Sequence, residues 1–299
     1  NKIGVVIATT GPGGSNAVGG VVEAWVDSAP VLVISGQVPS NQISPGVRSF
    51  GVQGFNIIEN VTEITKYAAQ ITNPKDTKMH LQKAIHWATT GRPGPVWLDI
   101  PMDIQAAEVD LAEMTGYTPP SAVAEVSRTE SQKIYNELLK SKRPLVVFGQ
   151  GIRQSNAIDL LVNFLNETKL PAIAARMGVD ILGDENPYYF GLGGVRGTAA
   201  AAEIMKSADF VLAIGTSFTH AFAGSRSEYF VSGIPVAMVN IDPTEFSKPG
   251  VSVDMSLKMD ASQFLKDFSN IQSDFKNRGS HDDWLVKCKR ILKENKIIK

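Results

Sequence analysis

Residues 4–16 read GVVIATTGPGGSN and carry two signals from which the rest of the fold can be worked out. The first half is a short run of apolar and β-branched residues, which predicts a buried strand, and the glycine-rich half predicts a tight turn. A helix is expected next, because apolar residues recur at helical spacing: Val18, Val21, Val22, Trp25 and Val26. A second apolar run at 30–35 completes a strand–helix–strand unit, whose two strands must be parallel because a helix connects them.

The same alternation continues along the chain. We expect a strand at 67–71, a helix at 75–89 and a strand at 95–100, with Met79, Ala84, Ile85 and Ala88 on the inner face of the helix. The stretch 36–60 is polar and aperiodic, which predicts an ordered loop with short helical turns. Among the tryptophans, Trp25, Trp87 and Trp97 lie in periodic apolar segments and are expected in the core.

A second α/β series follows a proline-containing segment. Its elements are predicted as helices at 129–140 and around 158–165 and strands at 144–149, 171–175, 209–215 and 234–241. The fold class is therefore α/β, with two doubly wound parallel-sheet domains at 1–103 and 129–270 joined by a linker at 104–128. Residues 271–299 are expected to form a linker and one amphipathic helix at about 282–294, whose Trp284 would pack on a further domain.

Composition narrows the class of partner. The 299 residues are 43% hydrophobic, which suffices for two cores, and the formal charge of −1 gives no reason to expect nucleic acid or an anionic membrane. No apolar run approaches the roughly 20 residues of a membrane span, and the single cysteine, Cys288, cannot form an internal disulfide. We expect a soluble, cytoplasmic protein that binds small molecules, without nucleic acid or membrane as partner.

The glycine-dense turn is the first candidate site. Glycines allow a ligand to approach the backbone, and the start of a helix supplies N–H groups and a partial positive charge. The turn at 9–16 therefore predicts a polar ligand at the carboxyl end of a strand. A tight turn that binds nothing remains the alternative.

Four blocks in the first half resemble the pyrimidine-binding domain of acetolactate synthases, which depend on thiamine diphosphate. They are residues 9–16, 24–30 with 34–39, 90–96 and 98–101, at the spacing of that family. The second half resembles the Rossmann-like central domain of the same family through 149–151, 193–198, 208–215 and 240–242. The resemblance covers nearly the whole chain.

The resemblance implies cofactor-binding residues in both halves. Those for the thiamine diphosphate pyrimidine ring are Thr9, Gly11, Pro12, Gly13, Asn16 and Gln53, although Gly54 stands where the family has an acidic residue. Arg92 corresponds to an FAD contact in flavin-containing members, and the glycines Gly193, Gly194 and Gly197 would allow a flat ligand such as FAD to lie close to the backbone. Because Ser217-Phe218-Thr219-His220-Ala221 replaces a family block with two arginines, FAD binding stays open.

The resemblance also implies a reaction: decarboxylation of a 2-keto acid, first of all pyruvate, and ligation to a second carbonyl compound. The family's catalytic glutamate would precede Asn1, and Mg²⁺ would be held through a diphosphate-binding domain outside this chain. We therefore expect no catalytic residue and no metal ligand here, an inactive chain on its own, and a homodimer or homotetramer in the longer protein. The acceptor, whether pyruvate, 2-ketobutyrate or a keto sugar, stays open.

Two other classes compete with this assignment. One is an FAD- or NAD-dependent oxidoreductase built on the second sheet, and the other is a non-catalytic binding module. The four histidines, His80, His86, His220 and His281, show no metal-ligand spacing, so we assign them no chemistry.

Overall fold

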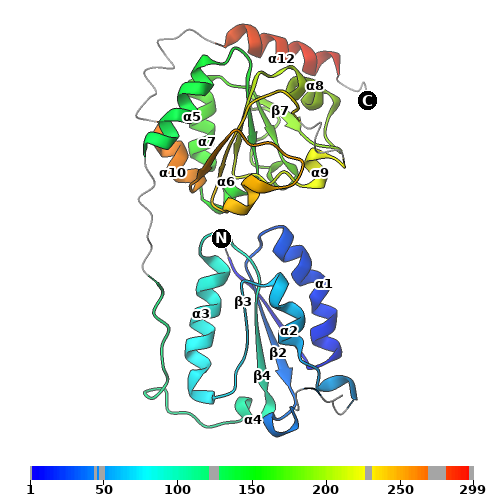
Figure 1. Cartoon of the computed structure of the whole chain (residues 1–299), viewed down its shortest axis with the longest axis vertical. Helices are drawn as coiled ribbons and strands as arrows, with labels where there is room; N and C mark the ends of the chain where they lie inside the picture. The colour runs from blue at the N-terminus through cyan, green and yellow to red at the C-terminus, as the bar shows by residue number, and fades with distance from the viewer. Residues whose placement is uncertain are drawn as a thin grey trace. The chain divides into compact units, whose positions relative to one another are not determined.

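The computed structural model describes residues 2–43, 46, 51–120, 128–225, 231–268 and 281–295. It divides into two compact units, residues 1–123 and 124–299, each built on a parallel sheet with helices on both faces (Figure 1). The predicted α/β class and the parallel pairing of the first two strands are confirmed. Among the described helices, none is long and apolar enough to cross a membrane.

The first unit has a four-stranded sheet in the order β1-β2-β4-β3. Its strands are β1 (Gly4–Ala8), β2 (Val31–Gln37), β3 (Tyr67–Gln70) and β4 (Val96–Pro101). Its α-helices are α1 (Pro12–Val26), α2 (Ile57–Val61), α3 (Thr77–Thr89) and α4 (Met102–Gln105). Short 3-10 turns lie at η1 (Ser40–Gln42), η2 (Gly51–Gln53), η3 (Thr62–Ile64) and η4 (Pro74–Asp76), so the described part of the predicted loop does contain short helical turns.

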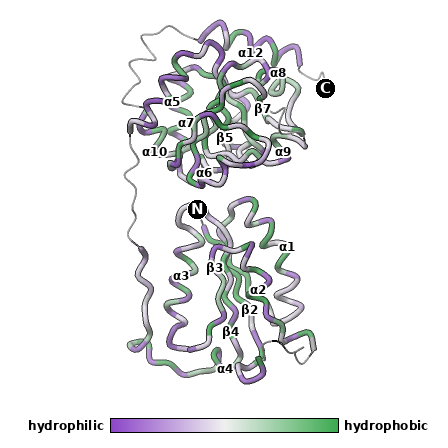
Figure 2. Tube along the Cα trace, viewed as in Figure 1, coloured by the Kyte–Doolittle hydropathy of each residue, from purple (hydrophilic) through white to green (hydrophobic). Residues whose placement is uncertain are grey.

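Alternating residues of β2 and β4 fill two separate cores. Val33 and Trp97 pack on one face against α1 and α2, and Leu32 and Leu98 pack on the other against α3. Both faces are apolar because helices cover both, as in most parallel sheets; the strands accordingly show hydrophobic colour in Figure 2. Trp97 is fully buried, as predicted.

Strand β1 is exposed rather than buried, which corrects the prediction for 4–9. Val5 is 57% exposed and Ile7 81% exposed, because β1 pairs with β2 on one side and stands at the edge of the described sheet. On α1, Val22, Trp25 and Val26 are exposed as well, so the expectation that Trp25 lies in the core was wrong.

Helix α3 also differs from the prediction in which side chains point inward. Ala84 and Ala88, four residues apart, form its buried stripe, whereas Ile85 and Trp87 are exposed. Short side chains lie inward because they let the helix approach the sheet closely, and the larger neighbours point away. Periodicity alone could not separate these alternatives.

The segment after α4 runs along α3 instead of leaving the first unit at once. Glu113 forms an ion pair with Lys75 at 2.5 Å, and the Thr115 hydroxyl donates to Asp76 at 3.1 Å. The backbone N–H of Tyr117 donates to the side-chain oxygen of Gln82 at 2.8 Å. The first part of the predicted linker is therefore docked on the first unit.

The second unit has a six-stranded parallel sheet in the order β10-β9-β8-β5-β6-β7. Its strands are β5 (Pro144–Phe148), β6 (Ala172–Ala174), β7 (Tyr189–Leu192), β8 (Phe210–Ile214), β9 (Val236–Asn240) and β10 (Met255–Lys258). Strands β7 and β10, at the two edges, were not anticipated from the sequence. Counting from β5, the order is 3-2-1-4-5-6, that of dinucleotide-binding sheets, with its switch point between β5 and β8.

Helices cover this sheet on both faces. They are α5 (Arg128–Lys140), α6 (Gly151–Gln154), α7 (Ile158–Thr168), α8 (Ala199–Ser207), α9 (His220–Ala223), α10 (Ala261–Asp267) and α12 (Asp282–Glu294). Two 3-10 turns accompany them, η5 (Arg176–Gly178) and η7 (Pro243–Ser247). One core lies under α5, α7 and α10, and the other lies under α8, α9 and α12.

Helix α12 spans the predicted residues but packs within the second unit. Its apolar face, formed by Trp284, Leu285, Cys288 and Ile291, is buried in the core beside α8. The indole N–H of Trp284 donates to the carbonyl of Pro144 at 2.8 Å. The expectation that Trp284 packs on a further domain was wrong, because the helix finds its apolar partner on the second sheet.

Two glycine loops meet at the switch point of the second sheet. A Cβ on Gly151 would lie 2.6 Å from Gly215 Cα and 2.7 Å from its carbonyl oxygen, and Gly151 N–H donates to that oxygen at 2.8 Å. Since these neighbours are backbone atoms, they cannot move aside as a flexible side chain would. Both loops therefore require glycine at this contact.

We expect Gly151→Ala to lower the free energy of unfolding by about 2 kcal/mol or more, as overpacking against a fixed backbone does. Gly20→Ala is the matched control, because a Cβ at this position within α1 meets nothing within 4 Å. It should raise stability by roughly 0.5–1 kcal/mol through helix propensity. Urea denaturation of the two variants checks both signs, and equal effects would contradict the packing argument.

Candidate functional site

The glycine turn connects β1 to α1 at the carboxyl end of the strand, where the sequence placed it. Gly11 is the N-cap of α1 with φ of 67°, a conformation that favours glycine, and Pro12 begins the helix. The turn closes through N–H donation from Gly14 to the carbonyl of Thr9 at 3.1 Å and from Ser15 to that of Gly11 at 2.9 Å.

The turn lies directly against residues 52 and 53. A Cβ on Gly11 would lie 2.3 Å from the carbonyl oxygen of Val52 and 3.0 Å from Gln53 Cα, so only glycine permits this approach. The Thr10 hydroxyl donates a short hydrogen bond to the Gln53 carbonyl. Gln53, 37 or more positions away from the turn in sequence, is therefore brought to its side.

The structure brings together the residues predicted for the pyrimidine ring. Thr9, Pro12 and Asn16 are exposed on the turn and the first turns of α1, Gly13 is half-buried, and Gln53 is exposed beside Gly11. These side chains are uncharged and offer hydroxyl and amide groups. Their role in binding stays a prediction.

A buried polar network supports the turn from below. Asp99 on β4 is fully buried and accepts hydrogen bonds from Ser35 at 2.6 Å, from Gln70 at 2.9 Å and from Gln37 at 3.1 Å. Burial raises the pKa of the Asp99 carboxyl, and these hydrogen bonds oppose the shift. This network was not predicted from the sequence, in which its one signal is the presence of polar residues inside otherwise apolar strands.

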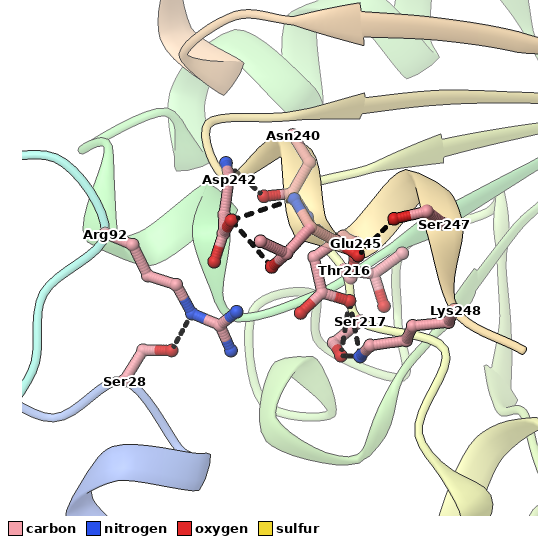
Figure 3. Close-up of polar contacts among 10 residues, drawn as sticks. Ser28, Arg92, Thr216, Ser217, Asn240, Asp242, Glu245, Ser247 and Lys248 are labelled. Carbon is pink, nitrogen blue, oxygen red and sulfur yellow. Dashed lines mark hydrogen bonds and ion pairs between the residues drawn. The ribbon is translucent and has the colours of Figure 1, made fainter. Parts of the chain in front are cut away.

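Arg92 lies at the opposite end of the first sheet. It precedes β4 and donates from Nε to the Ser28 hydroxyl at 2.7 Å, just beyond the end of α1 (Figure 3). The length of α1, about 1.5 Å for each of its 15 residues, separates Ser28 from the glycine turn. Arg92 thus does not join the turn residues within this unit.

Lys66 holds the loop that carries Arg92. Its ammonium donates to the carbonyls of Thr90 at 2.5 Å and Arg92 at 2.6 Å and lies 5.9 Å from the ring centre of Trp87. Burial lowers the pKa of the Lys66 ammonium to about 8. Gly94 permits the crossing of the lysine stem, since a Cβ there would lie 3.0 Å from Lys66 Cδ.

The glycines predicted for a flat ligand in the second unit contact protein instead. A Cβ on Gly193 would lie 2.9 Å from the Phe222 ring, and one on Gly194 would lie 2.8 Å from the Ala221 carbonyl oxygen. A Cβ on Gly197 would lie 2.4 Å from the carbonyl oxygen of Leu192, so this glycine packs against its own loop. Packing against α9 accounts for Gly193 and Gly194, and packing within the loop accounts for Gly197. The part of these glycines in FAD binding stays a prediction.

A polar cluster stands at the carboxyl ends of β8 and β9 (Figure 3). The buried carboxylate of Glu245 accepts from Ser217 at 2.8 Å and pairs with Lys248 at 2.5 Å. Asn240 donates to the Thr216 carbonyl at 2.9 Å, and the buried Thr216 hydroxyl has no hydrogen-bond partner among the described residues. The Ser217 hydroxyl, where the family block would begin, thus lies between the Glu245 carboxylate, to which it donates, and the Lys248 ammonium, which donates to it.

No group of three or more His, Cys, Asp or Glu side chains gathers as a metal ion requires, within the part of the chain that the structure describes. His80 instead shares a hydrogen bond of 2.6 Å with the Tyr67 hydroxyl, and burial lowers the pKa of its imidazole.

Two family profiles match the chain, one on each unit. Residues 1–67 match the N-terminal TPP binding domain of thiamine pyrophosphate enzymes, and residues 131–268 match their central domain. The chain belongs to the thiamine pyrophosphate enzymes. The glycine turn, η2 and α2 all lie inside the first match, and β5 to β10 lie inside the second.

Curated relatives place this thiamine pyrophosphate enzyme chain near acetolactate synthases. It is 30% identical over 292 residues to the acetolactate synthase large subunit of Lactococcus lactis, covering 95% of this chain and 48% of that protein. It is 32% identical over 247 residues to the isozyme 2 large subunit of Escherichia coli, covering 83% and 44%. The large subunit of Corynebacterium glutamicum is 32% identical over 252 residues, covering 83% and 39%. The chain spans less than half the length of each of these three.

The lowered pKa of Lys66 makes the stability of this chain depend on pH. Between about 8, its folded value, and the ordinary 10.5, the unfolded chain holds a proton that the folded chain has released. Below this range both states hold the proton, and the folded chain bears the full free-energy cost of burying the ammonium. As the pH rises through the range the folded chain loses the proton first, so this cost disappears and stability increases. In urea denaturation, the stability of the wild type should therefore gain on that of Lys66→Met as the pH rises from 8 to 10.5.

Lys78→Met, at an exposed position of α3, is the matched control for this measurement. Its stability should follow the wild type across the same range. Stability curves that run parallel for the wild type and Lys66→Met would refute the assignment of the titration to Lys66.

Proposed function

We propose that the protein containing this chain uses thiamine diphosphate to decarboxylate a 2-keto acid and to join the resulting fragment to a second carbonyl compound. The observation that carries the proposal is the glycine turn with Gln53 at its side, within the segment matched to the N-terminal TPP binding domain. Similarity to acetolactate synthase large subunits favours pyruvate as the 2-keto acid. The acceptor is a second pyruvate, 2-ketobutyrate or a keto sugar.

The residues at the turn fit the aminopyrimidine ring of this cofactor. The ring is neutral and carries hydrogen-bond donors and acceptors, and Thr9, Asn16 and Gln53 present uncharged polar groups at one corner. Pro12 offers an apolar surface beside them. When bound, the cofactor supplies the carbon nucleophile and electron sink for the reaction.

The contribution of this chain is to bind and orient. Gly11 lets the segment around Gln53 close on the turn, and the buried network beneath it fixes both against the sheet. We propose that Mg²⁺, the cofactor diphosphate and the catalytic acid are held by parts of the longer protein outside this sequence. We further propose that the longer protein is a homodimer or homotetramer, as the sequence resemblance implies. A reducing compartment, the cytoplasm, fits the single cysteine, which is free and buried.

FAD is the second cofactor to consider. The strand order of the second sheet, with its switch point between β5 and β8, favours a nucleotide there. The Phe222 ring beside Gly193 opposes a flat ligand there, and the Ser217 hydroxyl is already engaged by Glu245 and Lys248. The thiamine-dependent reaction requires no electron transfer to a flavin, so the proposed function holds with or without one.

Titration of the full-length protein with thiamine diphosphate and Mg²⁺ in a calorimeter tests the assignment. We expect saturable binding to the wild type and about tenfold weaker binding to Asn16→Ala, because one hydrogen bond at the ring is lost. Asn166→Ala, at an exposed position of α7, is the matched control and should bind as the wild type does. Absence of binding to the wild type would overturn the proposal.

The visible absorption spectrum of the purified full-length protein tests FAD separately. Because Gly193 and Gly194, which a flat ligand would need, already contact α9, we expect no stoichiometric flavin band. Carboligation measured without added FAD should then equal that with FAD. If the wild type instead carries stoichiometric flavin and Gly194→Ala loses it, FAD binds at this glycine loop and the expectation is wrong.

A further inference from the structure

Three strands of the first sheet place polar side chains in one row. Ser35 on β2 and Gln70 on β3 are the register partners of Asp99 on the central strand β4. The row lies on the face that carries Trp97, whose indole N–H donates to the Ser35 hydroxyl at 2.8 Å. Gln37 follows Ser35 by two residues on the same face, one step nearer the carboxyl edge.

Asp99 acts as a buried acceptor in this row. Ser35 donates to one carboxylate oxygen, and Gln37 and Gln70 both donate to the other. Among the described residues, these three donors are neutral and Asp99 pairs with no cation. A buried carboxyl group held in this way is costly to place, so its position calls for an explanation beyond packing.

The carboxylate decides which way the Gln37 amide faces. Its NH₂ group donates to Asp99 and to the Phe55 carbonyl, each at 3.1 Å, while its oxygen accepts from Val38 N–H at 2.9 Å. The reversed amide would set its oxygen against two acceptors and its NH₂ against a donor. Asp99 and Val38 therefore select one orientation.

That orientation holds the segment beside the glycine turn. Gln37 reaches the Phe55 carbonyl through its NH₂ group and lies 3.3 Å from the Thr10 hydroxyl through its oxygen. The same Thr10 hydroxyl donates to the Gln53 carbonyl. The single hydroxyl proton of Thr10 goes to Gln53, so Thr10 holds residue 53 at the turn while the Gln37 amide holds residue 55 against the sheet.

We propose that Asp99 and Gln37 are positioning residues that hold the 53–55 segment, and with it the Gln53 side chain, at the glycine turn in the arrangement that receives the cofactor ring. The inference rests on the proposed function for its ligand. It adds a support for the binding corner that lies inside the sheet and contacts no ligand itself.

Two variants of the full-length protein test it. Asp99→Asn keeps the volume but turns one acceptor oxygen into an NH₂ group that faces a donor, and Gln37→Met keeps the chain length but removes the amide. Each should weaken thiamine diphosphate binding, measured by calorimetry with Mg²⁺, by about tenfold. Because both act through one amide, the double variant should be no weaker than Gln37→Met alone.

Asp267→Asn is the matched control. Asp267 is a buried acid of the second unit that accepts from Ser131 at 2.9 Å and from Gln263 at 3.0 Å, so its loss of stability should resemble that of Asp99→Asn. Its affinity for thiamine diphosphate should equal that of the wild type. If a general loss of stability lowered the affinity, Asp99→Asn and Asp267→Asn would lose affinity alike. If Asp99 and Gln37 act by positioning, only Asp99→Asn and Gln37→Met lose affinity.

Hydrogen–deuterium exchange without cofactor gives a second measurement. In Gln37→Met, amides of residues 52–57 should exchange about tenfold faster, and those of α12 should not change. If the wild type binds cofactor and the Asp99 and Gln37 variants bind like Asp267→Asn, the inference is overturned. If the wild type does not bind, the proposed function fails, and exchange at 52–57 still decides whether Gln37 holds this segment.

Discussion

The buried carboxylate of Asp99 is the constraint around which the first unit is arranged. It stands inside a parallel sheet whose two faces are otherwise covered by apolar cores, and Ser35, Gln37 and Gln70 from the two adjacent strands satisfy it. A polar group so placed must be matched by donors, because an unmatched one destabilises the fold. The match fixes the strand register and also extends, through Gln37, to the loop at the carboxyl edge.

The two units use glycine for different purposes. Gly11 and Gly151 allow backbone segments to approach each other, one at a strand-to-helix turn and the other at the switch point of a doubly wound sheet. Gly193 and Gly194 accommodate an aromatic ring of the protein itself. A glycine-rich motif therefore marks a close approach, and only the structure shows whether backbone, side chain or ligand makes it.

Much of the fold could be predicted because the apolar runs that form β2, β4, β5 and β8 are bounded by turn residues. The edge strands β7 and β10 are short and only partly apolar, so the hydrophobic pattern did not predict them. The glycine turn and its partner Gln53 could be named from a family pattern. The network beneath them could not, since Ser35, Gln37 and Asp99 come from different strands and meet only through register.

The open edge of the first sheet has a practical meaning for anyone who handles this chain by itself. β1 is paired on one side only within the described structure and displays Val5 and Ile7 next to the exposed face of α1. Such a strand presents unpaired backbone groups next to exposed apolar side chains, and this combination is a template for edge-to-edge aggregation. Charged side chains in place of Val5 and Ile7 would remove the apolar part of that template, so handling of this chain in solution should depend on these two positions.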